Sequence, residues 1–259
     1  MHHIYLSSEN VRRAMSACAA LVMLMLSAIA HAQGGPPLVT DDPDTPGDNH
    51  WEINIASIVS HDHQRLTRLS APDMDINYGW GDRIQLKLDL PISLSHDSDA
   101  GWAMGVGSTE FGIKWRFIDG GEDGWSVSTY PQYITGWTHA TLRHALADNL
   151  HEYFLPVEAS KSFGSFKIDG ELGRDFVPNG ESVWMTGIVL AHDVLEGTEG
   201  LFEIHETIGP SGTATLLNLG LHHEFSKDLG LITAVGHEFG PALTNPRGLL
   251  VYLGVQVKR

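Results

Sequence analysis

The chain has 259 residues, of which 42% are hydrophobic and 19% are charged, a composition typical of one large all-β domain or two smaller ones. This composition excludes a disordered chain. Sixteen Lys and Arg residues stand against 32 Asp and Glu residues, and the resulting net charge of −16 makes nucleic acid a poor candidate partner.

Residues 1–32 have the pattern of a cleaved secretory signal peptide. Two arginines precede an apolar run over 14–29, and the small residues of "AHA" at 30–32 match a signal-peptidase site. An uncleaved helical anchor is the alternative. Cleavage would remove Cys18, the chain's single cysteine, and leave 14 Lys and Arg against 31 Asp and Glu. Disulfides, thiol catalysis and zinc–thiolate sites are therefore excluded for the mature chain.

Residues 33–49, "QGGPPLVTDDPDTPGDN", are rich in Pro, Gly and Asp. Such a composition predicts an extended leader with no core of its own. Its aspartates could gather calcium, but their spacing does not match a calcium loop such as the EF-hand. A polar tether is the favoured interpretation of this segment.

From residue 50 to the C-terminus, apolar and polar residues alternate in short segments. In "IQLKLDLPI", residues 84–92, one face is oily and the other charged, because successive side chains of a strand point to opposite sides. Gly, Asp, Asn or Pro clusters separate the segments, which predicts strands. We expect about twelve, at 51–60, 72–80, 83–92, 109–118, 124–135, 151–163, 165–176, 182–192, 200–208, 214–226, 229–239 and 248–258.

The connections between these strands differ in length. Those after the second, fourth, sixth, eighth and tenth strands are mostly brief, although "DVLEGTEG" from Asp193 is longer. Those after the first, third and fifth are long. This asymmetry is typical of Gram-negative outer-membrane barrels, with short periplasmic turns and longer outer loops. In the long loop 136–150, leucines at helical spacing predict a segment that either folds into the pore or covers it from outside.

Aromatic residues gather at the short-turn end of the predicted strands. A ring of aromatics at one level is typical of a barrel at the lipid headgroup boundary, although large residues also cap the cores of soluble sandwiches. The predicted membrane-interface residues are Trp51, Trp80, Phe117, Trp125, Phe163, Phe166 and Phe225.

The opposite faces of several strands carry charges of both signs. In a barrel these would line the lumen, where charges of opposite sign can pair across the interior, so they act either as structural pairs or as a selectivity lining. Pairing is the favoured interpretation, because enclosed charges need partners. The predicted lumen-lining residues are Arg83, Lys87, Asp89, Glu110, Lys114, Arg116, Lys167, Asp169 and Glu171.

Histidines and serines supply few signs of catalysis or metal binding. His61 and His63 lie two residues apart in a loop, and His222 and His223 are strand neighbours that face opposite sides, so neither pair predicts a metal site. Ser and His also occur together near Ser95, but no third group is placed to orient them. We therefore predict no enzyme activity, no cofactor and no metal.

Three motifs resemble a family of outer-membrane barrels named after the MetA pathway of phenol degradation. They are the leader "VTDD" at 39–42, the hairpin "YGWGDRIQLKLDLP" at 78–91 and the strand "GVGSTEFGIKWRF" at 105–117. The resemblance implies a barrel of about twelve strands that passes hydrophobic or aromatic compounds. Related barrels usually end on an aromatic residue that the assembly machinery reads, whereas this chain ends in Lys and Arg, so recognition would use Tyr252 and its strand.

The sequence thus predicts a transmembrane antiparallel up-and-down β-barrel of about twelve strands, residues 50–259, in the cell outer membrane. We expect a passive channel for small solutes, including hydrophobic or aromatic ones, whose partners are outer-membrane lipid, the solute and the assembly machinery. One alternative is a plugged barrel that binds a ligand. The other is a soluble periplasmic β-barrel or sandwich whose oily face is its core.

Overall fold

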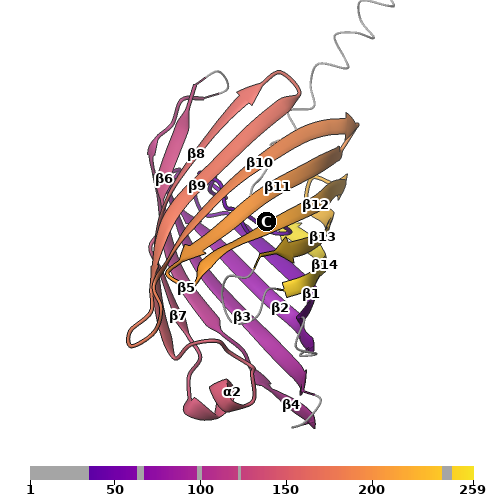
Figure 1. The fold of residues 1–259 in the computed structure, drawn as a ribbon. Coiled ribbons are helices and arrows are strands. Elements are labelled where there is room, and N and C mark those ends of the chain that lie inside the picture. Colours follow the sequence, from indigo (N-terminus) through magenta and orange to yellow (C-terminus); the bar gives the residue numbers. More distant parts are fainter. Residues whose placement is uncertain (1–34, 63–66, 98–100, 122–123, 241–246) are drawn as a thin grey trace, which may run out of the picture. The chain divides into compact units, whose positions relative to one another are not determined.

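Strands occupy most of the described chain, as the alternating pattern predicts (Figure 1). The computed structural model describes residues 35–62, 67–97, 101–121, 124–240 and 247–259, all of which belong to one compact unit. The predicted signal peptide, with Cys18, lies outside the described residues. The elements are β1 (Trp51–Asp62), β2 (Thr67–Trp80), β3 (Ile84–Asp97), β4 (Gly101–Val106), β5 (Thr109–Ile118), β6 (Ser126–Thr129), β7 (Gln132–Thr135), α2 (His139–Arg143), β8 (His151–Phe163), β9 (Phe166–Phe176), β10 (Val183–Leu195), β11 (Thr198–Gly209), β12 (Gly212–Ser226), β13 (Leu229–Phe239) and β14 (Arg247–Lys258).

The strands close into an antiparallel barrel. Strands that follow one another in sequence are paired, except β4 with β5 and β6 with β7. β1 pairs with β14 from Glu52 opposite Lys258 to Asp62 opposite Arg247. β3 pairs with both β4 and β5, so β4 and β5 together form one wall strand with a break. In the same way β8 pairs with both β6 and β7, which form a second interrupted wall strand. Fourteen segments therefore make the twelve-stranded up-and-down barrel that the sequence predicts.

Both breaks lie where proline or glycine interrupts the ladder. The predicted strand 124–135 divides at Pro131, whose nitrogen carries no hydrogen to donate. Its carbonyl still accepts a hydrogen bond from the Ile113 N–H, at 3.1 Å. Next to the break, Tyr130 turns inward and is fully buried against Gly112, where a Cβ atom would lie 2.5 Å from the tyrosine ring. The missing side chain at this glycine lets the ring enter the lumen.

Most connections are shorter at one end of the barrel than at the other, as predicted, although β11 and β12 are joined by a two-residue turn at the end with the long loops. β2–β3, β8–β9, β10–β11 and β12–β13 are joined by two- or three-residue turns at one end, here called the short-turn end. The predicted connection from Asp193 is mostly strand, because β10 continues to Leu195. The other end, here called the loop end, carries the segment with α2 (Figure 1). There the His144 carbonyl accepts a hydrogen bond from inward-facing Ser95, and Leu146 is buried, so this loop packs into the mouth of the barrel.

The barrel is apolar outside and polar inside. On β5, Phe111, Ile113 and Trp115 are exposed on the outer surface, while Lys114 is buried in the interior. The same division runs along β9 and β12. A soluble barrel would bury its apolar side chains and would not expose a continuous apolar belt, so the outer surface is suited to lipid. No helix within the described ranges is long and apolar enough to cross a membrane.

Candidate functional site

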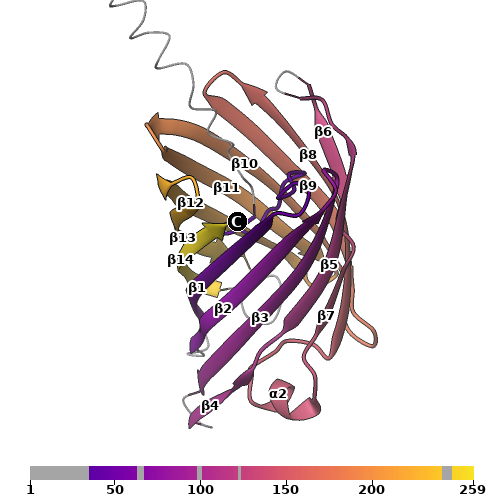
Figure 2. The ribbon, with the colours of Figure 1, turned by 180° about the vertical axis from the view of Figure 1, so that it is seen from behind.

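The lumen of the barrel contains the N-terminal leader. Residues 35–46 run inside the barrel before the chain enters β1, and Figure 2 shows this indigo segment behind the strands of the wall. Thr40 is fully buried and Asp42 nearly so. The prediction of an extended tether without a core was therefore wrong, because the leader uses the interior of the barrel as its core.

Leu38 holds the leader by an apolar contact. It is buried in a cluster with side chains from several strands of the wall, namely Ala56, Val189, Ala191, Leu201, Ile232, Ala234 and Tyr252. Four of these wall residues are alanine or valine, and their small side chains leave room for the leucine. Two glycines extend this space, because a Cβ atom at Gly220 would lie 3.2 Å from Leu38 and one at Gly187 would lie 1.8 Å from Thr40 Oγ1.

Glu203 of β11 binds the main chain of the leader. Its carboxylate accepts hydrogen bonds from the N–H groups of Val39, at 3.1 Å, and Thr40, at 2.6 Å. The Asn218 side chain donates to the other oxygen of the same carboxylate, at 3.1 Å. Main-chain donors that enter a barrel cannot join a strand ladder, so this buried carboxylate supplies their acceptor.

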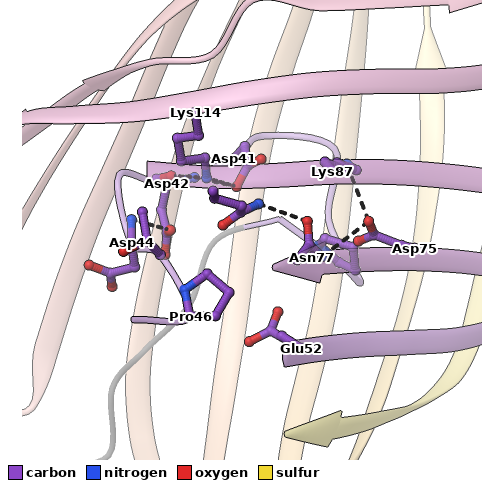
Figure 3. A pocket seen from close by; sticks show the side chains of 12 residues that line it. Asp41, Asp42, Asp44, Pro46, Glu52, Asp75, Asn77, Lys87 and Lys114 are labelled. Atoms are coloured by element: carbon purple, nitrogen blue, oxygen red, sulfur yellow. Dashed lines mark hydrogen bonds and ion pairs between the residues drawn. The ribbon is translucent and has the colours of Figure 1, made fainter. Parts of the chain in front are cut away.

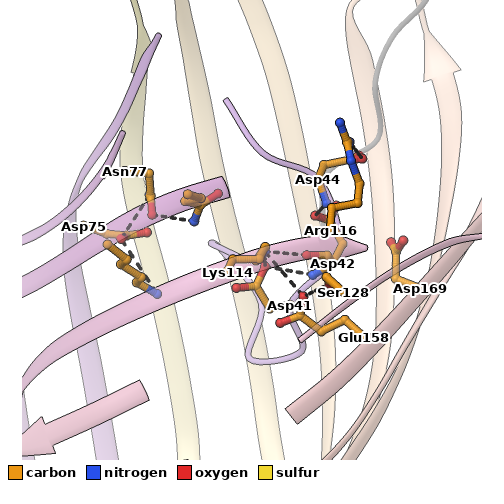
Figure 4. A network of polar contacts seen from close by, with 12 residues as sticks. Asp41, Asp42, Asp44, Asp75, Asn77, Lys114, Arg116, Ser128, Glu158 and Asp169 are labelled. Carbon is orange, nitrogen blue, oxygen red and sulfur yellow. Dashed lines mark hydrogen bonds and ion pairs between the residues drawn. The ribbon is translucent and has the colours of Figure 1, made fainter. Parts of the chain in front are cut away.

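Three wall cations bind the aspartates of the leader, and Figure 4 labels two of them, Lys114 and Arg116. Lys114 Nζ lies 2.9 Å from Asp41 Oδ1 and also donates to the Asp42 carbonyl. Lys167 Nζ lies 2.8 Å from Asp42 Oδ2 and 3.0 Å from Asp44 Oδ2. Arg116 reaches Asp44 at 3.3 Å.

The wall itself supplies further anions around the same cations. Glu158 lies 3.7 Å from Lys114 and accepts a hydrogen bond from Ser128 at 2.5 Å. Asp169 lies 3.4 Å from Lys167. The ring of Tyr130 lies 4.9 Å from the Lys114 ammonium, within the range of a cation–π contact. Lys114 and Lys167 are therefore each shared between the leader and the wall, which ties the leader to the barrel by buried charge pairs.

A second cluster surrounds Lys87, on the wall beside the leader (Figure 3). Its ammonium lies 3.3 Å from Glu110 and 3.8 Å from Asp75. The amides of Asn54 and Asn77 donate to the two oxygens of Asp75. These contacts link the adjacent strands β1, β2, β3 and β5 on the inner face of the wall.

Two cavities lie on either side of this layer. The larger, of about 330 Å³, lies toward the loop end and is lined by the leader and by residues such as Ile58, Ile134 and Phe154. The smaller, of about 30 Å³, lies toward the short-turn end and is lined by Thr45, Glu52 and Gln85 among others (Figure 3). Both are lined by Asp41, Asp75 and Lys87, so these residues stand between them.

The structure places eight of the nine predicted lumen residues on inward-facing strand positions and brings them near the leader or the larger cavity. Asp89, Glu110 and Glu171 line the cavity, and Lys114, Arg116 and Lys167 contact the leader. Arg83 lies instead in the exposed turn before β3, because the strand begins one residue later. The seven predicted interface aromatics are all exposed near the short-turn end, and their contact with lipid headgroups stays a prediction.

Several lumen residues were missed by sequence reasoning. Glu158, Glu203, Asp75 and Tyr130 are all buried in the interior. The alternation of β2, β8 and β11 contains the signal for the first three, since each stands between outward-facing apolar neighbours. Tyr130 has no such signal, because it lies in the break of a wall strand.

Two residues among the candidates for catalysis or metal binding have structural partners. Asp148, beside the histidines of the long loop, forms an ion pair with Arg68 at 2.7 Å. His223 Nδ1 lies 2.8 Å from the Thr198 hydroxyl. In the part of the chain that the structure describes, no group of three or more His, Cys, Asp or Glu side chains is arranged to hold a metal ion.

Comparisons with solved structures identify the fold. No family model matches the chain, and no curated protein matches it in sequence. An outer membrane channel from Pseudomonas putida F1 is similar with a TM-score of 0.62 and 12% identity, over 84% of this chain and 98% of that one. The NanC porin (TM-score 0.56, 9% identity) covers 80% of this chain and 98% of its own. The KdgM porin is similar with a TM-score of 0.55 and 12% identity, over 79% of this chain and 98% of that one.

At these identities the likeness is one of fold. The fold shared with these proteins is a closed antiparallel barrel, and the apolar outer surface of this chain is suited to lipid. Together they place the chain in the outer membrane, as its sequence predicts.

Proposed function

We propose that the chain is an outer-membrane channel for small solutes, hydrophobic or aromatic ones among them, whose lumen is occupied by its own leader. The observation that carries the proposal is the cavity of about 330 Å³ inside the barrel. This volume is near the lower end of the range for pockets that hold one small organic molecule. Its lining combines apolar side chains, such as Ile58, Phe154 and Leu250, with charged ones.

The leader determines what passes. Beyond the layer of Asp41, Asp75 and Lys87, the remaining space is only about 30 Å³, enough for water but not for an organic solute. Passage of such a solute from the larger cavity therefore requires the leader to move. Because the leader is held by side-chain contacts and not by strand pairing, it can move without opening the barrel wall.

Two further observations support this proposal. The "VTDD" and hairpin motifs resemble those of the barrel family associated with phenol degradation, which suggests aromatic solutes. The solved structures with this fold include two porins and an outer membrane channel.

Uptake by proteoliposomes tests the proposal. We would use two aromatic ions that do not cross lipid, benzyltrimethylammonium and benzenesulfonate, with raffinose as a larger solute. A channel of this size should admit at least one aromatic ion faster than protein-free vesicles do, and should exclude raffinose. If neither ion enters faster than in protein-free vesicles, the channel function is wrong.

The second candidate is a plugged barrel that binds a ligand without passing it. The filled lumen favours this candidate, because three wall cations and an apolar cluster hold the leader in place. It predicts ligand binding without uptake and a very low ion conductance in a planar bilayer. The uptake and conductance measurements therefore separate the two candidates.

A further inference from the structure

The larger cavity is strongly acidic. Eight of its lining residues are Asp or Glu, and Lys87 is the one basic residue among the described residues that line it. Asp75 and Glu110 pair with Lys87, and Asp41 pairs with Lys114. Glu152 accepts a hydrogen bond from the Asn149 side chain. These four carboxylates account for half of the eight acidic residues.

The remaining four carboxyl groups are Asp73, Asp89, Glu171 and Asp175. Asp73 and Asp89 share a hydrogen bond between their side chains, and Glu171 accepts a hydrogen bond from the main chain of Asp41. None of the four forms a salt bridge with a basic side chain of the described residues. The Oδ1 atoms of Asp89 and Asp175 are buried and have no hydrogen-bond partner within the described part of the chain. A buried carboxylate oxygen without a partner is costly, and a cation placed beside it would offset that cost.

Asp175 is the clearest case of a buried carboxylate oxygen without a partner. It is only 8% exposed and lies one residue before the loop end of β9. Its register partners on the two neighbouring strands are Phe154 and Val183, both of which are buried and apolar. The unpartnered oxygen thus has apolar residues on both sides and a cavity beside it.

The apolar part of the lining determines what kind of cation fits. Leu38, Ile58, Ile134 and Leu250 present hydrocarbon surface, which gives no advantage to a hydrated inorganic ion. Phe154 and Tyr252 add aromatic rings, whose faces attract ammonium groups. The low-dielectric wall of the barrel also concentrates the negative potential of the carboxylates, which repels anions.

We infer that this cavity selects organic cations, meaning small molecules with an ammonium group and an apolar or aromatic body. The inference rests on the proposed function of the same cavity and names its substrate class. The ammonium group would lie beside Asp175, in a cavity that Asp89 also lines, and the apolar body would lie against Phe154, Tyr252 and the leader.

Calorimetric binding to the detergent-solubilised full chain tests this inference. Benzyltrimethylammonium and benzenesulfonate are suitable ligands, because each is a single ring with a permanent charge of opposite sign. We expect the cation to bind at least about tenfold more tightly than the anion. Equal binding of the two ions, or no binding of the cation, would overturn the inference.

Substitution locates the site. Asp175→Asn should weaken binding of the cation by about tenfold, because it removes the charge but keeps the shape of the side chain. Glu199→Gln is the matched control, since Glu199 is a buried lumen carboxylate near the short-turn end that does not line the cavity. If both variants bind the cation as the wild type does, the site assignment is wrong. Should Asp175→Asn fail to give a heat-modifiable band on a gel, Asp89→Asn takes its place.

The outcomes separate this inference from the channel proposal. Selective binding of the cation without uptake of either ion would refute the channel and leave the inference standing. Uptake of both ions at equal rates with equal binding would refute the inference and leave the channel standing.

Discussion

Lys167→Met should release the leader from the lumen while leaving the barrel closed. The ammonium of Lys167 lies 2.8 Å from Asp42 and 3.0 Å from Asp44, both in the leader, and 3.4 Å from Asp169 in the wall. Its removal leaves three carboxylates together without that cation. Attraction between leader and wall then becomes repulsion.

The size of the effect follows from burial. Removing one partner of a buried ion pair typically costs about 3–5 kcal/mol, because the other charge remains buried. Lys167 is 7% exposed and Asp169 is fully buried, so solvent screens these charges little. We take about 3 kcal/mol for docking of the leader, since Arg116 still holds Asp44. This corresponds to an increase on the order of a hundredfold in the released fraction.

Two measurements follow the release. Proteinase K added to proteoliposomes should cleave Lys167→Met within residues 35–46 much faster than the wild type, as read by mass spectrometry. Single-channel conductance in a planar bilayer should rise, because the lumen is emptied. Lys161→Met is the matched control, since Lys161 lies on the outer surface over Trp125 and Phe163 and should change neither quantity.

Unchanged cleavage and unchanged conductance in Lys167→Met would refute the reasoning. The ion pairs would then contribute little to docking, and the apolar cluster around Leu38 would have to hold the leader. A heat-modifiable band on a gel establishes in each case that the barrel itself has folded.

Three other substitutions test the remaining contacts of the leader and the wall. Gly187→Ala should also speed cleavage and raise conductance, because its Cβ atom would lie 1.8 Å from a hydroxyl oxygen of the leader, whereas Gly170→Ala, with its nearest contact at 3.9 Å, should not. Leu38→Ala should weaken docking by about 2–5 kcal/mol, seen in the same cleavage assay, and wild-type cleavage would contradict the apolar anchor. Leu219→Arg, midway along β12, should lower the free energy of unfolding in liposomes by about 2–4 kcal/mol, while Leu229→Arg at the short-turn end should cost about 0–1 kcal/mol. Equal costs at these two positions would contradict the membrane placement.

Alternation of side chains was sufficient to predict the barrel. In β3 and β5 the inward and outward faces differ so consistently that a shift of one residue would expose charge to lipid, which fixes the register. Pro131 was also visible in the sequence, but the sequence did not show that it divides one wall strand into β6 and β7. Whether a proline ends a strand or only breaks its ladder depends on the neighbouring strands, and these are not known before pairing.

Contacts between distant segments could not be predicted in the same way. Glu203 and Asn218 face the lumen by their period, yet nothing local shows that Glu203 accepts hydrogen bonds from Val39 and Thr40, more than 160 residues earlier. The larger cavity is similarly invisible in sequence, because its floor is the leader and its walls come from many strands.

The position of the leader was nevertheless implied by a mismatch of charges. Lys114, Arg116 and Lys167 face the lumen of a barrel whose interior is enclosed, and enclosed cations need anionic partners at close range. A leader with aspartates at 41, 42 and 44 carries charges of the opposite sign immediately before the first strand. Residues 42 and 44 both reach Lys167, because in an extended segment alternate side chains lie on one face. An acidic segment next to a barrel with inward-facing cations therefore predicts a filled lumen more directly than it predicts a tether.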